Sequence, residues 1–166
     1  MYLYLKQKPL SSDEKFTFFD EQQKPVFKSM GSFFAIPRRY KLFDAVKNQE
    51  IVDITRRFFA FTPNFTITDT TTKQSLFFVK QCVFFGKPRF EISSSSGNYR
   101  IEGDLSKYEY DIIDPFGQRI ISVRTKLISW GDTYEIWADN TKIPLHVAAS
   151  IVLTVNCAAH SASRII

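Results

Sequence analysis

The sequence predicts a mainly β protein: a closed barrel of about 12 antiparallel strands, built from six hairpin units, around a central hydrophobic C-terminal α-helix. Two observations carry this prediction. A unit of two strands recurs about every 24 residues, and the segment from Ile143 to Ser163 contains no charged residue apart from two histidines. A third observation, a hydrophobic content of 44% with 16% aromatic residues, argues against a disordered chain.

With 166 residues, the chain is long enough to bury a core of its own. We expect a single domain over residues 1–166, with the barrel strands in 1–143 and the central helix in 144–163. The net charge of +5 is a mild bias toward anionic partners. Because basic residues are spread along the chain with carboxylates between them, we expect no nucleic-acid partner.

The first strand of each unit alternates apolar and polar residues, as is typical of a strand with one buried face. A polar turn follows each copy. The short Asp side chain that ends most copies can accept hydrogen bonds from backbone N–H groups two residues on, so we expect these aspartates to close turns rather than to catalyse. The six copies are FTFFD (16–20), YKLFD (40–44), FTITD (65–69), FEISS (90–94), YDIID (110–114) and YEIWAD (134–139).

A second apolar strand follows the turn in five units. In the sixth unit the corresponding segment, KIPLHV (142–147), loses the strand pattern. A sheet of about twelve strands rarely stays open, and closure removes its edges. A barrel of that size has an interior too wide for strand side chains to fill alone. The five second strands are VFKS (26–29), EIVDIT (50–55), SLFFVKQ (75–81), YRIEG (99–103) and RIISVR (119–124).

A helix over 144–163 is expected to fill this interior. Pro144 suits a first helical turn, and a helix that meets protein on all sides needs no charged face. The segment also has the length of a membrane span, roughly 30 Å, so an anchor is the alternative. Asn156, two histidines and four Ser/Thr residues favour the buried helix, because such groups find partners in protein but not in lipid. A β-branched run over 151–155 leaves a strand open as a third possibility, against which the alanine content argues.

No recognised catalytic or metal-binding motif occurs in the chain. The two cysteines form no CxxC pair, and there is no glycine-rich phosphate loop, Walker motif or GxSxG. His146 and His160 on one helix would lie roughly 21 Å apart, too far to share a metal. We therefore expect no catalytic residues, no metal and no cofactor, and a protein that is not an enzyme. A pocket at the barrel mouth that serves a small-ligand carrier or an enzyme is the alternative.

Four arginines are expected to meet at one rim of the barrel. Pairing of strand 38–44 with strand 50–57 brings Arg38 and Arg39 to the same end as Arg56 and Arg57. Arginine suits bidentate contact with phosphate, so these residues form a candidate site for an anionic headgroup. A solvated rim that carboxylates partly neutralise is the alternative. The Phe-rich bends at 58–61 and 84–85 leave a protein-protein interaction module as a further option.

Several segments together resemble the LURP-one-related family, which is grouped with the tubby C-terminal and phospholipid-scramblase-like proteins. The resemblance covers almost the whole chain, which looks like a short member of the bacterial type. It implies a twelve-stranded barrel around a hydrophobic helix. The segments are LKQKPLSSDEKFTFFDEQQKPVFK (5–28), KPRFEISSSSGNYRIEGDLSKYEYDIID (87–114), SWGDTYEI (129–136) and the apolar C-terminus.

The resemblance implies lipid binding only by analogy of fold, because tubby relatives bind phosphoinositides and scramblase relatives act at membranes. We therefore expect a non-enzymatic binding or scaffolding module, with an anionic membrane lipid or an unidentified protein as partner. No transmembrane span is expected. The N-terminal residues contain no charged leader before an apolar core, so we expect a cytoplasmic location, with peripheral association at the membrane as a further option.

Overall fold

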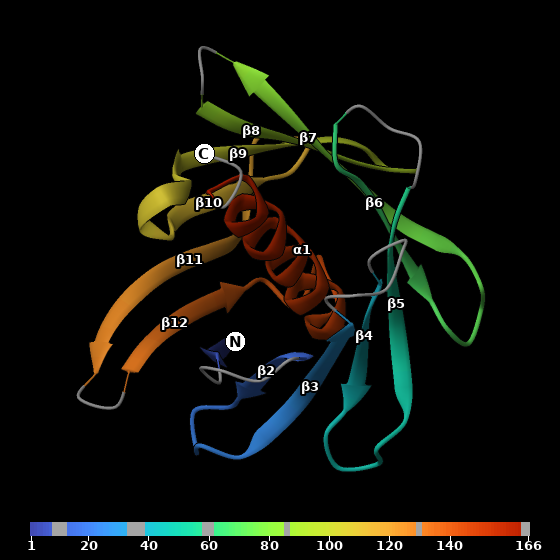
Figure 1. The fold of residues 1–166 in the computed structure, drawn as a ribbon, viewed down its shortest axis with the longest axis vertical. Coiled ribbons are helices and arrows are strands. Elements are labelled where there is room, and N and C mark those ends of the chain that lie inside the picture. Colours follow the sequence, from blue (N-terminus) through green and yellow to red (C-terminus); the bar gives the residue numbers. More distant parts are fainter. Residues whose placement is uncertain (8–12, 33–38, 58–61, 85–86, 129–130, 164–166) are drawn as a thin grey trace.

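The computed structural model describes residues 1–7, 13–32, 39–57, 62–84, 87–128 and 131–163. Its strands close into one antiparallel barrel, in the order β1-β12-β11-β10-β9-β8-β7-β6-β5-β4-β3-β2. A helix occupies the interior (Figure 1). The elements are β1 (Tyr2–Gln7), β2 (Asp13–Phe19), β3 (Pro25–Ser32), β4 (Arg39–Asp44), β5 (Glu50–Arg56), β6 (Asn64–Asp69), β7 (Ser75–Phe84), β8 (Lys87–Ser94), β9 (Gly97–Asp104), the 3₁₀-helix η1 (Leu105–Lys107), β10 (Glu109–Ile113), β11 (Arg119–Ile128), β12 (Gly131–Ala138) and α1 (Leu145–Ser163).

The predicted fold class is confirmed, and the alternation of the first strands explains it. Residues at every second position point into the barrel and are almost fully buried, whereas their neighbours face outward. Ile67, Ile92 and Ile112 are at most 1% exposed. Every pairing in the ladder is antiparallel, as hairpin connections require.

The twelfth strand comes from the N-terminus rather than from the sixth unit. β1 pairs with β12, where Tyr4 lies opposite Glu135, and on its other edge with β2, where Tyr4 lies opposite Phe19. Leu3 and Leu5 of β1 are fully buried. The sixth unit therefore keeps only its first strand, β12, because its second half leaves the wall to form the helix.

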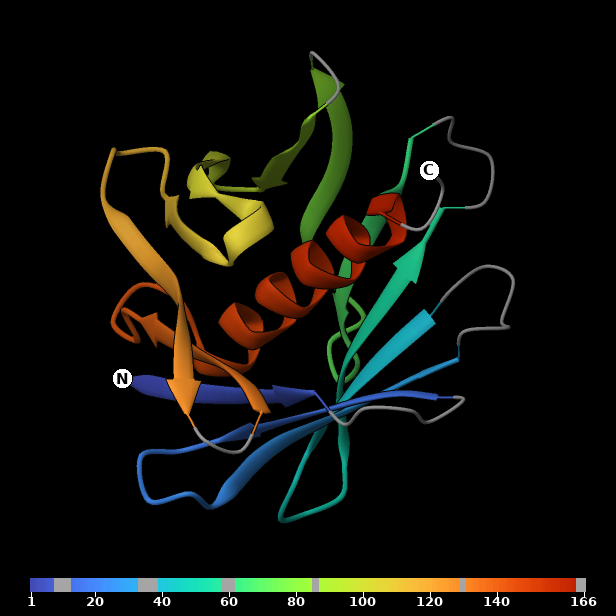
Figure 2. The same ribbon diagram turned by 60° about the vertical axis from the view of Figure 1, so that its left-hand side comes forward.

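α1 crosses the barrel interior obliquely, as the view in Figure 2 shows. Three of its polar side chains find hydrogen-bond partners inside the protein. The Ser150 and Thr154 hydroxyls each donate to a carbonyl four residues earlier at 2.7 Å, and Asn156 Oδ1 accepts from the Tyr110 hydroxyl at 3.0 Å. Among the described residues, no helix is both long and apolar enough to cross a membrane.

The aspartates close turns at one end of the barrel, as predicted. In five turns Oδ1 accepts the backbone N–H two residues on, at 2.9–3.1 Å. The hydroxyl of Ser94 takes this role in the β8–β9 turn, where it accepts from the N–H of Ser96 at 3.0 Å. These side chains stabilise the turns, because their carboxylates accept backbone hydrogen bonds there. The five residues are Asp20, Asp44, Asp69, Asp114 and Asp139.

Candidate binding cleft

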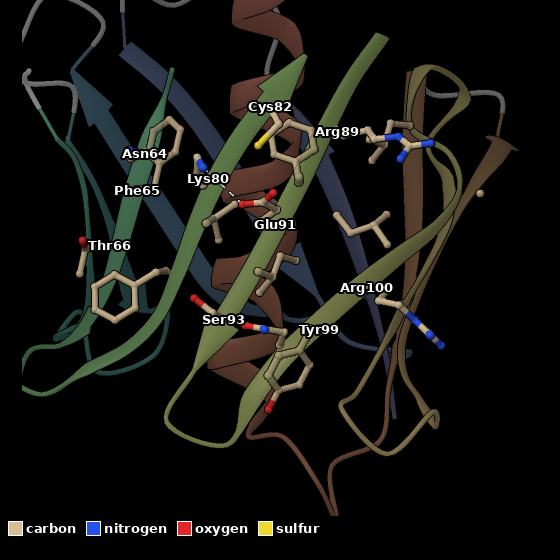
Figure 3. A pocket seen from close by; sticks show the side chains of 18 of the residues that line it. Asn64, Phe65, Thr66, Lys80, Cys82, Arg89, Glu91, Ser93, Tyr99 and Arg100 are labelled. Atoms are coloured by element: carbon tan, nitrogen blue, oxygen red, sulfur yellow. Dashed lines mark ion pairs between the residues drawn. The ribbon is translucent and has the colours of Figure 1, made fainter. Parts of the chain in front are cut away.

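The barrel wall opens between β8 and β9. The ladder between them contains three pairs, of which Ile92 opposite Tyr99 is the last. Both strands continue beyond that pair: β8 stays paired with β7 back to Lys87, and β9 stays paired with β10 on to Asp104. The two strands therefore diverge with distance from their turn (Figure 3). We call the gap between them beyond Ile92 and Tyr99 the wedge.

Gly103 lets the end of β9 lie close against β10, beyond the point where β9 leaves β8. Its φ of +121° lies in a region that L-residues rarely adopt. A Cβ at this position would come within 2.3 Å of the Glu109 carbonyl oxygen and 2.8 Å of Tyr110 Cα. The next residue, Asp104, turns the chain into η1, with its Oδ1 accepting the N–H of Ser106 at 2.9 Å. This local geometry commits the end of β9 to β10.

A cleft of about 1370 Å³ follows the wedge. Strands β6 to β9, η1 and Arg57, the residue after β5, supply its lining. Phe90 and Ile92 of β8 line it from the buried face of the strand, and Glu91 and Ser93 line it from the outer face. The cleft therefore passes both faces of β8 and connects the outer surface with the apolar interior.

The charged side chains that line the cleft are predominantly cationic. Lys80 Nζ lies 3.4 Å from Glu91 Oε2 on the outer surface, where screening makes such a pair weak. The Arg57 guanidinium lies over the ring of Phe78, 6.0 Å from its centroid, and Phe78 is 40% exposed. The cationic side chains of the lining are Arg57, Lys80, Arg89 and Arg100, and its carboxylates are Glu91 and Asp104.

Two buried acceptor atoms lie on the strands beside the cleft. Within the described part of the chain, Asn64 Oδ1 and Gln81 Oε1 have no hydrogen-bond partner. Asn64 belongs to the lining. Gln81 is 4% exposed and lies opposite Phe90 in the β7–β8 ladder. A buried acceptor without a donor costs free energy.

The Cys82 thiol beside the cleft is not activated for bond-making. Burial, together with the nearby Glu91 carboxylate, raises the pKa of the Cys82 thiol, and the thiol is the less nucleophilic form. Burial lowers the pKa of His146 at the start of α1, against the effect of Asp69. In the ranges that the structure describes, no three His, Cys, Asp or Glu residues are placed to hold a metal ion. The side chain of His160 lies outside the described residues.

The predicted arginine rim is partly assembled. Arg39 lies opposite Thr55, which brings it to the same end of the sheet as Arg56 and Arg57. Arg39 Nε donates to Asp53 Oδ1 at 2.7 Å, and its second donor bonds the other oxygen of the same carboxylate. This bidentate contact lowers the pKa of Asp53.

Arg56 and Arg57 differ in their surroundings. Arg56 continues the inward-facing positions of β5, whereas Arg57 is exposed and borders the cleft. Arg38 lies outside the described residues. A binding role for the four arginines remains a prediction.

Sequence reasoning missed the cleft. FEISS (90–94) and YRIEG (99–103) have the same alternation as hairpins that pair along their full length, so nothing in the pattern indicates that β8 and β9 separate. The one available signal was the glycine at position 103, immediately before Asp104. A glycine at a strand end often marks a bulge or a close backbone approach.

Comparison with known proteins supports the resemblance seen in the sequence. A model of the LURP-one-related family matches residues 1–155. The uncharacterized protein YxjI of Bacillus subtilis (strain 168) is 31% identical over 134 residues, which span 81% of this chain and 79% of YxjI. The X-ray structure of the Arabidopsis thaliana protein AT5G01750 superposes with a TM-score of 0.65 over 93% of this chain and 90% of that protein, at 12% identity. At that identity the match concerns the fold alone.

Proposed function

This chain belongs to the LURP-one-related family, and from the chemistry of its cleft we propose that it is a non-enzymatic binding module for ligands that carry anionic groups. The observation that carries the proposal is a cleft of about 1370 Å³ in which four cationic side chains face two carboxylates. A concave site with an apolar floor and a few convergent polar groups is the usual form of a ligand site.

Arg57 is the side chain best placed to contact an anion. Its guanidinium lies near the exposed ring of Phe78 and carries N–H donors that can bind two oxygens of one phosphate. Lys80 lies on the neighbouring outer face of the cleft. Arg39 is a weaker candidate than the sequence suggested, because its Nε and one of its terminal nitrogens already bond Asp53.

A binding role agrees with the state of the groups around the cleft. The raised pKa of Cys82 keeps this side chain protonated as a thiol. The Lys80–Glu91 ion pair is exposed, so a ligand can displace it at little cost. The anionic group has two plausible sources, the headgroup of a membrane lipid and a soluble phosphate compound. A headgroup would make the protein peripheral at a membrane surface.

The test compares wild type with the double variant Arg57→Gln/Lys80→Gln. Sedimentation with phosphatidylcholine vesicles, with and without phosphatidylserine, measures headgroup binding, and titration with inorganic phosphate measures binding of the soluble anion. Charge-assisted hydrogen bonds contribute about 1.5–3 kcal/mol each, so the double variant should bind its anion at least about ten-fold more weakly. Binding to either source should also weaken as salt concentration rises.

Lys6→Gln provides a matched control, because Lys6 also lies over an aromatic ring, 5.0 Å from the centroid of Phe19, but on the distant strand β1. It should bind as wild type does. Binding of neither anion, or equal binding by wild type and the double variant, would contradict the proposal.

A further inference from the structure

We propose that the wedge between β8 and β9 binds an extended peptide segment of a partner protein, which pairs as an added strand with the facing edges of the barrel wall. The inference goes beyond anion binding, because it uses the backbone edges of the wedge rather than Arg57 and Lys80. Either proposal can therefore fail without the other.

The backbone of β8 and β9 along the wedge gives the first indication of the ligand. Phe90 and Glu91 of β8 pair with β7 on one side, and Arg100 and Ile101 of β9 pair with β10 on the other. None of these four residues has a ladder partner across the wedge. In an antiparallel ladder, successive residues direct their N–H and C=O groups to alternate sides. About half of the main-chain polar groups along each edge are therefore directed into the wedge.

Only another extended chain matches this arrangement. An exposed strand edge is a template for pairing, and a peptide strand supplies donors and acceptors at the same spacing. A lipid acyl chain has no hydrogen-bonding groups, and a helix uses its own backbone groups internally. Either of those ligands would leave the buried part of the wedge unsatisfied, at a cost in free energy.

The side chains around the wedge indicate the composition of the peptide. On the inner side Phe90 is 7% exposed and Ile92 is 1% exposed, and Ile101 is partly buried against the core. On the outer side Arg100 of β9 and Glu91 of β8 are both exposed, and their ion pairs, Arg100 with Glu102 at 3.5 Å and Glu91 with Lys80 at 3.4 Å, lie in solvent. Because a strand turns alternate residues to opposite faces, the matching peptide alternates apolar residues with charged ones, and acidic residues suit the positions beside Arg100.

The probe is an eight-residue peptide of alternating valine and glutamate with blocked termini, and its binding to the full chain is measured by calorimetry and by backbone amide exchange. We expect a Kd below about 1 mM. Exchange should slow at residues 90–91 of β8 and 100–101 of β9. N-methylation of alternate residues removes the N–H donors along one edge of the peptide, so the odd-numbered and the even-numbered residues give two methylated peptides. At least one of these two should bind about ten-fold more weakly, or weaker still, than the parent peptide.

The variant Arg100→Glu tests the orientation of the acidic side chains. It should weaken binding of the valine–glutamate peptide about ten-fold and strengthen binding of the corresponding valine–lysine peptide. Lys24→Glu makes the same charge change on the exposed β2–β3 turn and should alter neither affinity. Arg57→Gln/Lys80→Gln should keep affinity for the peptide, which separates this test from that of anion binding.

Three results would overturn the inference. The first is no peptide binding below 1 mM in a protein that still binds anionic vesicles. The second is equal affinity for the parent peptide and both N-methylated forms. The third is binding whose exchange protection falls on strands other than β8 and β9.

Discussion

At the residue scale, one short carboxylate stabilises each of several turns. Asp44 Oδ1 accepts the N–H groups of Val46 and Lys47, both at 2.9 Å. Asp69 Oδ1 accepts from Thr71 at 2.9 Å and from Thr72 at 2.7 Å. These hydrogen bonds favour the ionised carboxylate, so the N–H of Lys47 lowers the pKa of Asp44 and that of Thr72 lowers the pKa of Asp69.

We predict that acid weakens the fold partly through these two turns. Because the folded-state pKa lies below the unfolded value of about 3.9, the unfolded chain binds more protons as pH falls. The contribution is therefore complete above the unfolded pKa and is lost as pH falls through the folded pKa. Urea unfolding between about pH 6 and pH 3 should show a smaller loss of stability in Asp44→Asn/Asp69→Asn than in wild type. Glu21→Gln, which neutralises one exposed carboxylate in the β2–β3 turn, serves as a control. An equally steep loss in the double variant and in wild type would contradict the prediction.

At the element scale, the separation of β8 from β9 depends on how closely β9 approaches β10. We predict that Gly103→Ala destabilises the protein by about 2 kcal/mol or more, because the new Cβ would meet the Glu109 carbonyl oxygen at 2.3 Å at a φ of +121°. Gly117→Ala is the matched control, since its φ is +82° but no atom lies within 4 Å of the added Cβ. It should cost about 1 kcal/mol. Urea denaturation measures both, and equal losses would show that the close approach to β10 is unimportant.

Also at the element scale, the local sequence pattern encodes most strands but not the long-range pairing that closes the barrel. Alternation identified both strands of five hairpins and the first strand of the sixth, because each strand has one face toward the core. It did not assign β1, which closes the barrel by pairing with β12 more than a hundred residues away along the chain. Such long-range pairing leaves no trace in a local pattern.

The sequence likewise predicts part of the candidate site but not all of it. The pairing register of β4 and β5 brings Arg39 and Arg56 to the same end of the sheet, as the turn between these strands predicts. The bidentate bond from Arg39 to Asp53 depends on the side-chain geometry of two outward-facing residues, and alternation alone cannot specify it. The wedge opens where β9 leaves β8 after Tyr99 and continues along β10, which Gly103 approaches closely. Both features arise from tertiary packing.

At the scale of the whole molecule, the helix and the barrel wall bury each other's apolar side chains in one core. α1 meets the barrel interior with small side chains, and Ala148, Ala149 and Ala158 are all fully buried. Their size lets the helix pack close to strands such as β5 and β7, which it contacts most. The inward-facing residues of the wall are buried largely because the helix covers them. Neither part has a second apolar surface to replace the other.

We therefore predict that deletion of residues 144–166 abolishes soluble folding. Without α1, the apolar interior of a twelve-stranded wall would be open to water, since strand side chains alone do not fill a barrel of that width. The measurements are yield in the soluble fraction and near-UV circular dichroism, which reports packed aromatic residues. Ile151→Ala in the intact chain tests the same packing more gently, and urea denaturation should show a loss of about 2–5 kcal/mol. A soluble, β-rich product of the deletion with a cooperative unfolding transition would mean that the wall closes without the helix.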